Sequence, residues 1–137
     1  MNIIVGGIIK KDNKYLLVKE AKEEYYGMYN IPAGHLDEGE LLIDGAKREI
    51  KEETGYDVNI TGIIQIASTK ECLILIFMGN PISKQGDYDK AEILSTNWLT
   101  YEEIIKIKDK LRAPKLLVEA IKCEKENKIY SLELIKN

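Results

Sequence analysis

Apolar and polar residues change their spacing along the chain, and these changes predict strands and helices in mixed order. Residues 3–20 hold two β-rich runs on either side of Asp12 and Asn13, which predicts a hairpin with its turn at that pair. Residues 22–40 are rich in glycine and proline and show no helical period, so we expect a loop there. The amino-terminal part of the chain is therefore predicted to be a hairpin followed by a loop.

The next segment has the spacing of an α-helix. Apolar residues recur with a helical period between Leu41 and Thr54, and Gly55 follows as a typical helix stop. Gly45 inside this segment costs about 1 kcal/mol relative to alanine, so we expect it to pack closely against a neighbour. Three apolar side chains lie on one side of the helix and can anchor it to a sheet: Ile43, Ala46 and Ile50.

Beyond this helix, apolar runs alternate with polar turns. Two β-rich runs are expected to pair with each other, a further strand and two helices follow, and the end of the chain alternates like a short strand. The paired runs are 58–68 and 71–80, the strand is 93–100, the helices are 101–107 and 113–126, and the terminal strand is 128–136. Helices and strands in this order predict an α/β or α+β sandwich.

Composition narrows the class of protein. A chain of 137 residues is most simply one domain, residues 1–137. The net charge of −3 argues against a nucleic-acid polymer as partner, because binding its backbone needs a basic face. Cys72 and Cys123 lie far apart without metal-ligand spacing, which is typical of reduced thiols in a cytoplasmic protein. Since no segment has the pattern of a secretory signal or a membrane span, we expect no association with a membrane.

The stretch REIKEETG, residues 48–55, concentrates charge on the predicted helix. Glu49, Glu52 and Glu53 are three and four residues apart and therefore share one face. Because like charges at this spacing repel, the face is either solvated surface or a site for a cation. The preceding loop adds Glu40 and a backbone shaped by proline and glycine, whose carbonyls can point at the same face. Hard divalent cations such as Mg²⁺ take oxygen ligands of this kind.

The spacing of these residues resembles the signature of the MutT-like Nudix hydrolases, G-x5-E-x7-R-E-U-x-E-E-x-G-U, in which U is a bulky aliphatic residue. Gly34 is followed after five residues by Glu40, after seven more by Arg48, Glu49 and Ile50, and then by Glu52, Glu53 and Gly55. Only Tyr56 departs, at the last position, and we expect this departure to affect packing alone. Such a long signature is far more specific than a lone glycine motif.

This resemblance implies a Nudix fold, an α/β/α sandwich with a mixed sheet. It also implies hydrolysis of a pyrophosphate linkage by water activated at a glutamate-bound Mg²⁺ or Mn²⁺ site. Glu49, Glu52 and Glu53 would be metal ligands, joined by the backbone carbonyl of Gly34, and one of the glutamates would accept a proton from the water. Arg48 would orient the glutamates. Divalent ions suit this reaction because they neutralise phosphate charge and make water nucleophilic.

Residues outside the fixed positions of the signature have open roles. Glu92, in the acidic segment 86–92, is either a further metal ligand or base or an ordinary loop residue. Tyr29 and Arg112 are candidates to contact a substrate ring and phosphate, with packing and surface roles as the alternatives. His35 is the only histidine and is a candidate loop or substrate-contact residue.

Loops around the signature resemble the Nudix branch that acts on nucleoside tri- and diphosphates and on a thiamine-precursor pyrophosphate. The alternatives are an ADP-ribose or nucleotide-sugar pyrophosphatase and a nucleotide-sensing Nudix-fold module without catalysis. Such modules usually lack signature glutamates, whereas all of them are present here. The expected partner is a small phosphorylated substrate, and the protein is expected to be a monomer or a homodimer.

Overall fold

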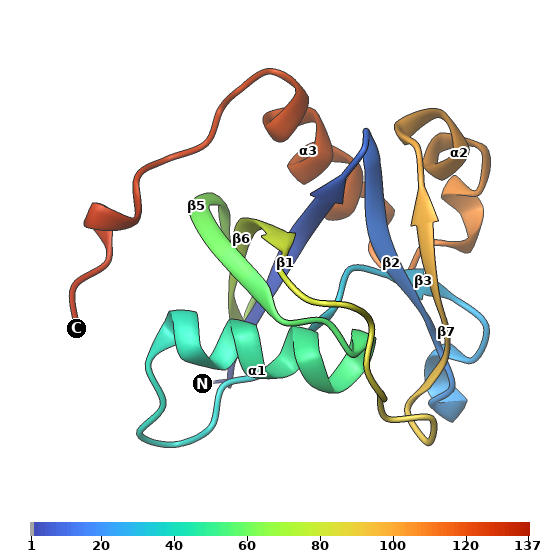
Figure 1. Cartoon of the computed structure of the whole chain (residues 1–137), viewed down its shortest axis with the longest axis horizontal. Helices are drawn as coiled ribbons and strands as arrows, with labels where there is room; N and C mark the ends of the chain where they lie inside the picture. The colour runs from blue at the N-terminus through green and yellow to red at the C-terminus, as the bar shows by residue number, and fades with distance from the viewer. Residues whose placement is uncertain (1) are drawn as a thin grey trace.

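Strands in the centre and helices on two sides give the molecule its layers (Figure 1). The computed structural model describes residues 2–137. Within this range the strands are β1 (Asn2–Lys11), β2 (Lys14–Glu20), β3 (Tyr29–Asn30), β4 (Ala33–His35), β5 (Val58–Ser68), β6 (Cys72–Pro81) and β7 (Ile93–Leu99). The α-helices are α1 (Leu42–Thr54), α2 (Tyr101–Lys106) and α3 (Pro114–Lys125), and 3-10 turns cover Glu23–Tyr25, Lys108–Lys110 and Leu132–Leu134.

Strand β1 organises the sheet. It pairs in parallel with β6 from Asn2 to Ile9, and its early residues pair antiparallel with β4 on the other side. Its last residues pair with β2, which in turn carries β3 and β7. Because β1–β6 is parallel and the other pairs are antiparallel, the sheet is mixed, as expected. This arrangement brings β4 next to α1, so the loop and the helix of the signature meet.

The turn between β1 and β2 lies where the sequence predicts it. Asp12 and Asn13 have φ angles of 50° and 63°, so both adopt the left-handed conformation. Two consecutive residues of this kind form the tight turn that matches the twist of a hairpin, and aspartate and asparagine tolerate it well. Lys11 pairs with Lys14 directly across the turn.

Two apolar clusters lie on opposite faces of the sheet. On one face, α1 contributes Ala46 and Ile50, which pack with residues of β1, β5 and β6 such as Phe77. On the other face, α2 and α3 contribute Ile104 and Ile121, which pack with β-strand residues that include Tyr15, Leu17 and Ile76. The α/β/α sandwich is therefore confirmed, with a separate layer of core on each side of the sheet.

Helix α1 follows the sequence prediction closely. It begins at Leu42, one residue later than expected, and its C-cap is Gly55, whose φ of 79° is the left-handed conformation that glycine adopts without strain. Gly45 is buried, and a side chain there would collide with Leu36 and Glu40. The expected close packing at Gly45 is thus confirmed. Because glycine has no side chain, Leu36 and Glu40 of the preceding loop can pack directly against the helix.

Two predictions of secondary structure are wrong. The segment 22–40 contains the short strands β3 and β4, because main-chain pairing with β2 and β1 stabilises segments that carry no periodic pattern of their own. The segment 128–136 is not a strand. Only Tyr130 pairs, through an isolated bridge to Ile63, and residues Leu132–Leu134 form a 3-10 turn that packs against β5.

Tyr56, the departure from the signature, packs as expected. Its ring meets that of Trp98 edge to face at 5.7 Å, and Trp98 Nε1 donates a hydrogen bond to Tyr56 Oη at 3.3 Å. The aromatic residue thereby replaces an aliphatic contact with a pair of rings in the α1-side cluster.

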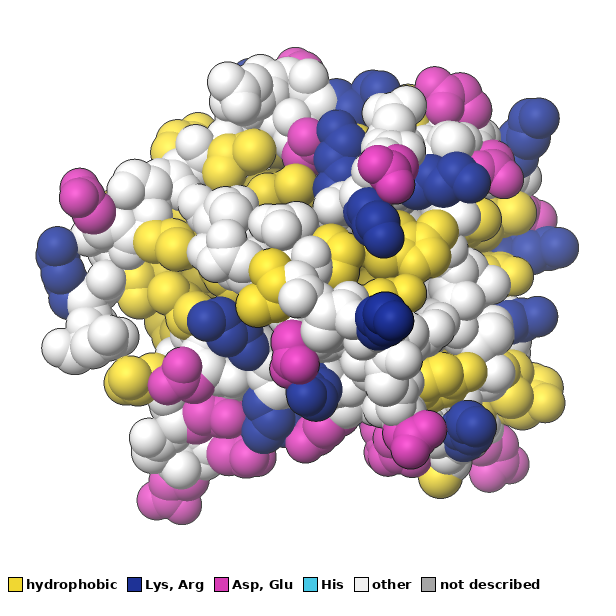
Figure 2. Space-filling model, viewed as in Figure 1, with side chains coloured by type: hydrophobic (Ala, Val, Ile, Leu, Met, Phe, Trp, Pro, Cys, Tyr) yellow, Lys and Arg dark blue, Asp and Glu magenta, His cyan; other side chains and the backbone are white. Residues whose placement is uncertain are grey.

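Acidic and basic side chains are interspersed on the face of the molecule in Figure 2, with apolar side chains exposed between them. No continuous basic surface occurs on this face. As for the helices of residues 2–137, each is too short or too polar to cross a lipid bilayer.

Candidate functional site

The side chains of the three signature glutamates on α1 are buried to different extents. Glu53 is 9% exposed, and its Oε1 accepts a hydrogen bond from the backbone N–H of Ala33 at 3.0 Å. The side chain of Glu49 is 13% exposed and that of Glu52 is 54% exposed. The shared face predicted from the helical period is therefore graded: two carboxylates turn towards β4, and the third lies at the solvent edge.

Gly34 leaves room for the carboxylate of Glu49 because it has no side chain. A Cβ atom on Gly34 would overlap the carboxylate of Glu49. Because glycine lacks that atom, the Glu49 carboxylate lies directly against the backbone of β4. Ala33 and Gly34, consecutive residues of one strand, thus contact consecutive turns of α1 through Glu53 and Glu49.

Arg48 connects the loop to the helix. Its Nε donates to Glu40 at 2.7 Å, and its Nη1 donates to Glu49 at 2.9 Å and to Glu52 at 3.2 Å. Its Nη2 donates to the backbone oxygen of His35 at 3.1 Å. A planar guanidinium with several donors suits this role, because it can hold carboxylates on two sides at once.

Negative charge accumulates around Glu53. The pKa of Glu53 is raised to about 8, chiefly by burial and also by the charges of Glu49, Glu20 and Glu92, while the hydrogen bond from the N–H of Ala33 opposes the rise. Burial also raises the pKa of Glu49, although its hydrogen bond from Arg48 opposes this. The carboxylates at this point therefore lack enough positive charge from the protein itself.

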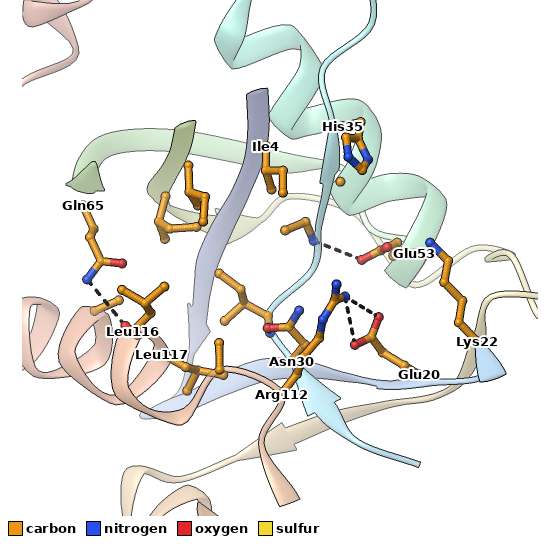
Figure 3. A pocket seen from close by; sticks show the side chains of 17 residues that line it. Ile4, Glu20, Lys22, Asn30, His35, Glu53, Gln65, Arg112, Leu116 and Leu117 are labelled. Carbon is orange, nitrogen blue, oxygen red and sulfur yellow. Dashed lines mark hydrogen bonds and ion pairs between the residues drawn. The ribbon is translucent and has the colours of Figure 1, made fainter. Parts of the chain in front are cut away.

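A cavity of about 200 Å³ opens beside these carboxylates, between α3 and the sheet (Figure 3). At one end, Glu53 lies near Glu20, Lys22 and Arg112. The other end is apolar apart from one amide, that of Gln65. Its apolar lining comes from the sheet and from α3 and includes Ile4, Ile31, Ile74, Ile76, Leu116, Leu117 and Ala120.

Arg112 is held firmly at the charged end. Its Nη1 donates to both carboxylate oxygens of Glu20, at 3.0 and 3.2 Å, and its guanidinium lies 3.7 Å from the centre of the Tyr25 ring. Glu20 is 6% exposed, so this ion pair is partly shielded from solvent. The Arg112 side chain lines the cavity and remains 34% exposed.

The structure brings together some of the residues predicted from the sequence. Gly34, His35, Glu53 and Arg112 line the cavity. Arg48 and Glu52 do not line this cavity; they line a separate, shallow hollow together with the segment Asp87–Asp89. Glu49 lies between these two groups, since it contacts both Gly34 and Arg48.

Two predicted residues lie apart from this group. Glu92 pairs with Lys22 across 3.6 Å at the rim, near enough for its charge to act on Glu49 and Glu53. Tyr29 does not line the cavity; it packs against the α3-side cluster, and its backbone oxygen accepts from the N–H of Arg112 at 2.9 Å. Its position supports Arg112 through the main chain.

Sequence reasoning missed four polar residues of the cavity: Glu20, Lys22, Asn30 and Gln65. Glu20 is separated from Arg112 by 92 residues in the chain, and no local pattern connects them. The one available signal was an acidic residue just after the apolar run of residues 15–18 of a strand, since a charge is seldom buried there unless it is paired.

Comparison with known proteins identifies similar chains. The family model described as NUDIX domain matches residues 2–120. The phosphatase NudJ of Shigella boydii is 30% identical over 98% of this chain and 90% of its own length. The ADP-ribose pyrophosphatase of Methanocaldococcus jannaschii is 31% identical over 76% of this chain and 70% of its own length. The chain also matches two Arabidopsis thaliana proteins, Nudix hydrolases 2 and 8, but spans only 40% and 35% of their lengths.

A solved structure supports the same relationship. The structure described as a NUDIX hydrolase from Nitrosomonas europaea superimposes with a TM-score of 0.91. It covers 99% of this chain and 96% of its own, at 30% sequence identity. The similarity therefore extends over the sheet, both helical layers and the terminal segment.

Proposed function

The chain belongs to the Nudix hydrolase family, and from that premise we propose that it hydrolyses a pyrophosphate linkage in a nucleoside di- or triphosphate or a related organic pyrophosphate. One observation carries the proposal. The carboxylates of Glu49 and Glu53 contact β4 at the end of a cavity whose same end holds Arg112. Hydrolysis of an anhydride needs these features together: acidic groups for the water and positive charge for the phosphates.

The residues present fit a divalent cation, Mg²⁺ or Mn²⁺. Glu49, Glu52 and Glu53 offer only oxygen atoms, the ligands that these ions prefer, and the cradle at Gly34 lets a carboxylate approach the backbone. The negative charges of Glu49, Glu20 and Glu92 near Glu53 also favour binding of a cation. The backbone carbonyl of Gly34 completes the proposed ligand set, and Glu92 is the candidate for an additional ligand.

Binding such an ion requires side chains to turn. Among residues 2–137, no three acidic, histidine or cysteine side chains are arranged to hold a metal ion together. Glu49 and Glu52 point at Arg48, and Glu53 points at the N–H of Ala33. The exposed Glu52 has the greatest freedom to reorient, while Arg48 keeps its bond to Glu40.

Each residue then has a role in the reaction. When bound, the cation supplies neutralisation of phosphate charge and a water of lowered pKa. One of the three glutamates accepts the proton of the attacking water. Arg48 keeps the glutamates in position, and Arg112 and His35 contact the phosphates or the leaving group. Tyr29 would contribute to substrate binding through the backbone bond by which it holds Arg112.

The substrate class has two candidates. Resemblance of the loops to the nucleoside tri- and diphosphatase branch, and the similar phosphatase NudJ, favour a nucleotide or a thiamine-precursor pyrophosphate. The similar ADP-ribose pyrophosphatase favours ADP-ribose or a nucleotide sugar instead. The first candidate is preferred because the relative named NudJ matches a larger share of both chains.

Product analysis tests this proposal. Wild-type protein is incubated with ATP, ADP, ADP-ribose and UDP-glucose, each with Mg²⁺ and with excess EDTA, and the products are separated by chromatography. We expect orthophosphate from ATP or ADP in the presence of Mg²⁺ and none with EDTA. Two monophosphates from ADP-ribose, without orthophosphate from nucleotides, would favour the second candidate. Absence of products from every compound would favour a nucleotide-sensing module, and turnover in EDTA would remove the metal from the mechanism.

A further inference from the structure

A β-bulge in β5 turns one amide side chain into the cavity. Ile63 pairs with Phe77 and Gln65 pairs with Ile76, so two steps along β5 oppose one step along β6, and Ile64 is the extra residue. Without the bulge, alternation would place Gln65 on the same face as Ile63, which packs towards α1. With it, Gln65 joins Ile64 on the α3 face and lines the cavity. Bulges commonly redirect a side chain in this way next to functional sites.

The amide of Gln65 has a defined orientation. Its Nε2 donates to the backbone oxygen of Leu116 in α3 at 3.5 Å. Since the backbone oxygen of Leu116 can only accept, the amide nitrogen faces α3, and the carbonyl oxygen Oε1 faces the cavity (Figure 3). Oε1 has no hydrogen-bond partner among residues 2–137, and it is not sealed from solvent. The inner end of the cavity therefore offers a ligand a single hydrogen-bond acceptor.

The surroundings of this acceptor favour a flat ring. Ile74, Ile76, Leu116 and Leu117 give the inner end apolar walls. A sugar carries several hydroxyl groups, and most would lose their hydrogen bonds to water here without replacement. A heterocycle presents apolar faces to such walls and one polar edge to the amide. The volume of about 200 Å³ is below the roughly 300–1,000 Å³ of pockets that enclose whole drug-sized ligands, so it suits one ring system.

The position of the acceptor at the end of the cavity selects among heterocycles. Figure 3 shows Gln65 at one end and Glu53, Glu20 and Lys22 at the other, so a ligand with its phosphates near Glu53 directs the far edge of its ring at Gln65. Adenine and cytosine carry an amino group at that edge, which donates a hydrogen bond. Guanine and thymine carry a carbonyl oxygen at the same place, and uracil has the same carbonyl as thymine. This oxygen can only accept a hydrogen bond, so it is repelled by Oε1 of Gln65.

We propose that Gln65 is a specificity-determining residue, and that its Oε1 accepts a hydrogen bond from the amino group of an amino-substituted heterocycle at the inner end of the cavity. The inference rests on the proposed hydrolysis of a phosphorylated substrate and adds the chemical class of its organic part. Bases with an amino group at the far edge are hydrolysed in preference to those with an oxygen there.

Two pairs of nucleotides test this inference, because the members of each pair differ at that edge. The measurement is kcat/KM at fixed Mg²⁺ for ATP against ITP and for CTP against UTP. For the wild type we expect a preference of about tenfold or more for the amino member of each pair, the size of one hydrogen bond made or lost. Gln65→Leu should reduce both preferences to within about twofold, since the acceptor is gone.

A second variant separates recognition from a merely structural role. Gln65→Glu keeps an acceptor oxygen but cannot donate to Leu116, so it should retain the preference for ATP and CTP. If Gln65 only ties α3 to β5, both variants will slow all four nucleotides by one common factor and leave the ratios unchanged. Asn59→Leu makes the same amide-to-leucine change at an exposed position of β5 and should leave rates and ratios at wild-type values.

The outcomes distinguish this inference from the proposed function. Nucleotide hydrolysis with equal rates within each pair, or with ratios that Gln65→Leu leaves intact, overturns the inference alone. Failure of the wild type to hydrolyse any of the four nucleotides overturns the inference together with the choice of nucleotides as substrates. Loss of the preference in Gln65→Leu, with its retention in Gln65→Glu and Asn59→Leu, supports the assignment.

Discussion

At the scale of single residues, Glu53 and Glu52 differ more than their adjacent positions suggest. Glu53 is 9% exposed and bonds to β4, whereas the Glu52 side chain is 54% exposed and bonds to Arg48. The helical period predicted that the glutamates share a face, and it could not rank their burial. That ranking depends on where β4 runs, which is set by pairing with β1. The buried carboxylate is the more sensitive probe of the proposed metal site.

Glu53→Gln removes a carboxyl group that can ionise and bind a cation, while keeping the shape of the side chain. We expect kcat/KM to fall by about 10²-fold or more, roughly 3 kcal/mol in the barrier, because a proposed metal ligand is lost. Melting temperature without metal should hold at neutral pH, where the raised pKa keeps Glu53 largely protonated, and should rise above pH 8, where the remaining carboxylates lose a charged neighbour. The rise in melting temperature on adding Mg²⁺ should shrink, since less cation binds the folded protein. The measurement combines kinetics with melting curves in Mg²⁺ and in EDTA.

A matched control lies on the same helix. Asp44→Asn makes the same change from carboxylate to amide at an exposed position in the first turn of α1. It should leave both activity and the Mg²⁺-dependent melting shift at wild-type values. Activity of Glu53→Gln within tenfold of wild type, together with an unchanged Mg²⁺ shift, would contradict a metal-binding role for Glu53.

At the scale of elements, the loop between β4 and α1 is fixed to the helix through Glu40. Both oxygens of Glu40 accept hydrogen bonds from Arg48, and Oε1 also accepts from the backbone N–H of Asp37 at 3.0 Å. These bonds, with that from Arg48 the largest cause, lower the pKa of Glu40 from 4.5 to about 2. The ionised form of Glu40 is therefore the one that binds the loop.

This lowered pKa predicts how the attachment depends on pH. Stability from the Glu40 carboxylate is fully present above pH 4.5, the value of the free side chain, and is lost as pH falls towards 2. Glu40→Gln should melt below the wild type at pH 7, and the difference should shrink between pH 5 and pH 2. Glu38→Gln, at an exposed position of the same loop, should match the wild type throughout. A difference that stays constant down to pH 2 would show that the charge of Glu40 does not hold the loop.

The same elements show what local sequence patterns can and cannot predict. Helix α1, the hairpin turn and the pairing of β5 with β6 follow from period, cap and turn residues that lie next to one another in the chain. Strands β3 and β4 do not, because they are two and three residues long and depend on partners elsewhere. The bulge at Ile64 reverses the expected facing of Gln65, and alternation alone cannot reveal such an insertion.

At the scale of the whole molecule, the cavity depends on contacts between distant segments. The signature predicted the side that carries Glu49 and Glu53, because those residues are fixed in spacing. The pairing of Arg112 with Glu20 and the bond from Gln65 to Leu116 join segments 92 and 51 residues apart. Such pairs form only when α3 and the segment before it pack on the sheet. Features of the signature are therefore accessible from sequence, whereas the features proposed to select a substrate are set by packing.

The two apolar clusters provide a test of the predicted single domain, residues 1–137. Ile50 in the α1-side cluster and Ile121 in the α3-side cluster are both 0% exposed, and the clusters share one sheet. Because each of the strands β1, β2 and β6 contributes to both faces, loss of packing on one face should destabilise the other.

Ile50→Ala and Ile121→Ala should each lower the free energy of unfolding by about 2–5 kcal/mol and lower the midpoint of a single transition in urea, with the slope unchanged. Unfolding followed by Trp98 fluorescence, on the α1 side, and by circular dichroism should coincide in both variants. Two separate transitions, or an Ile121→Ala variant whose Trp98 signal unfolds as in the wild type, would show that the two layers unfold independently.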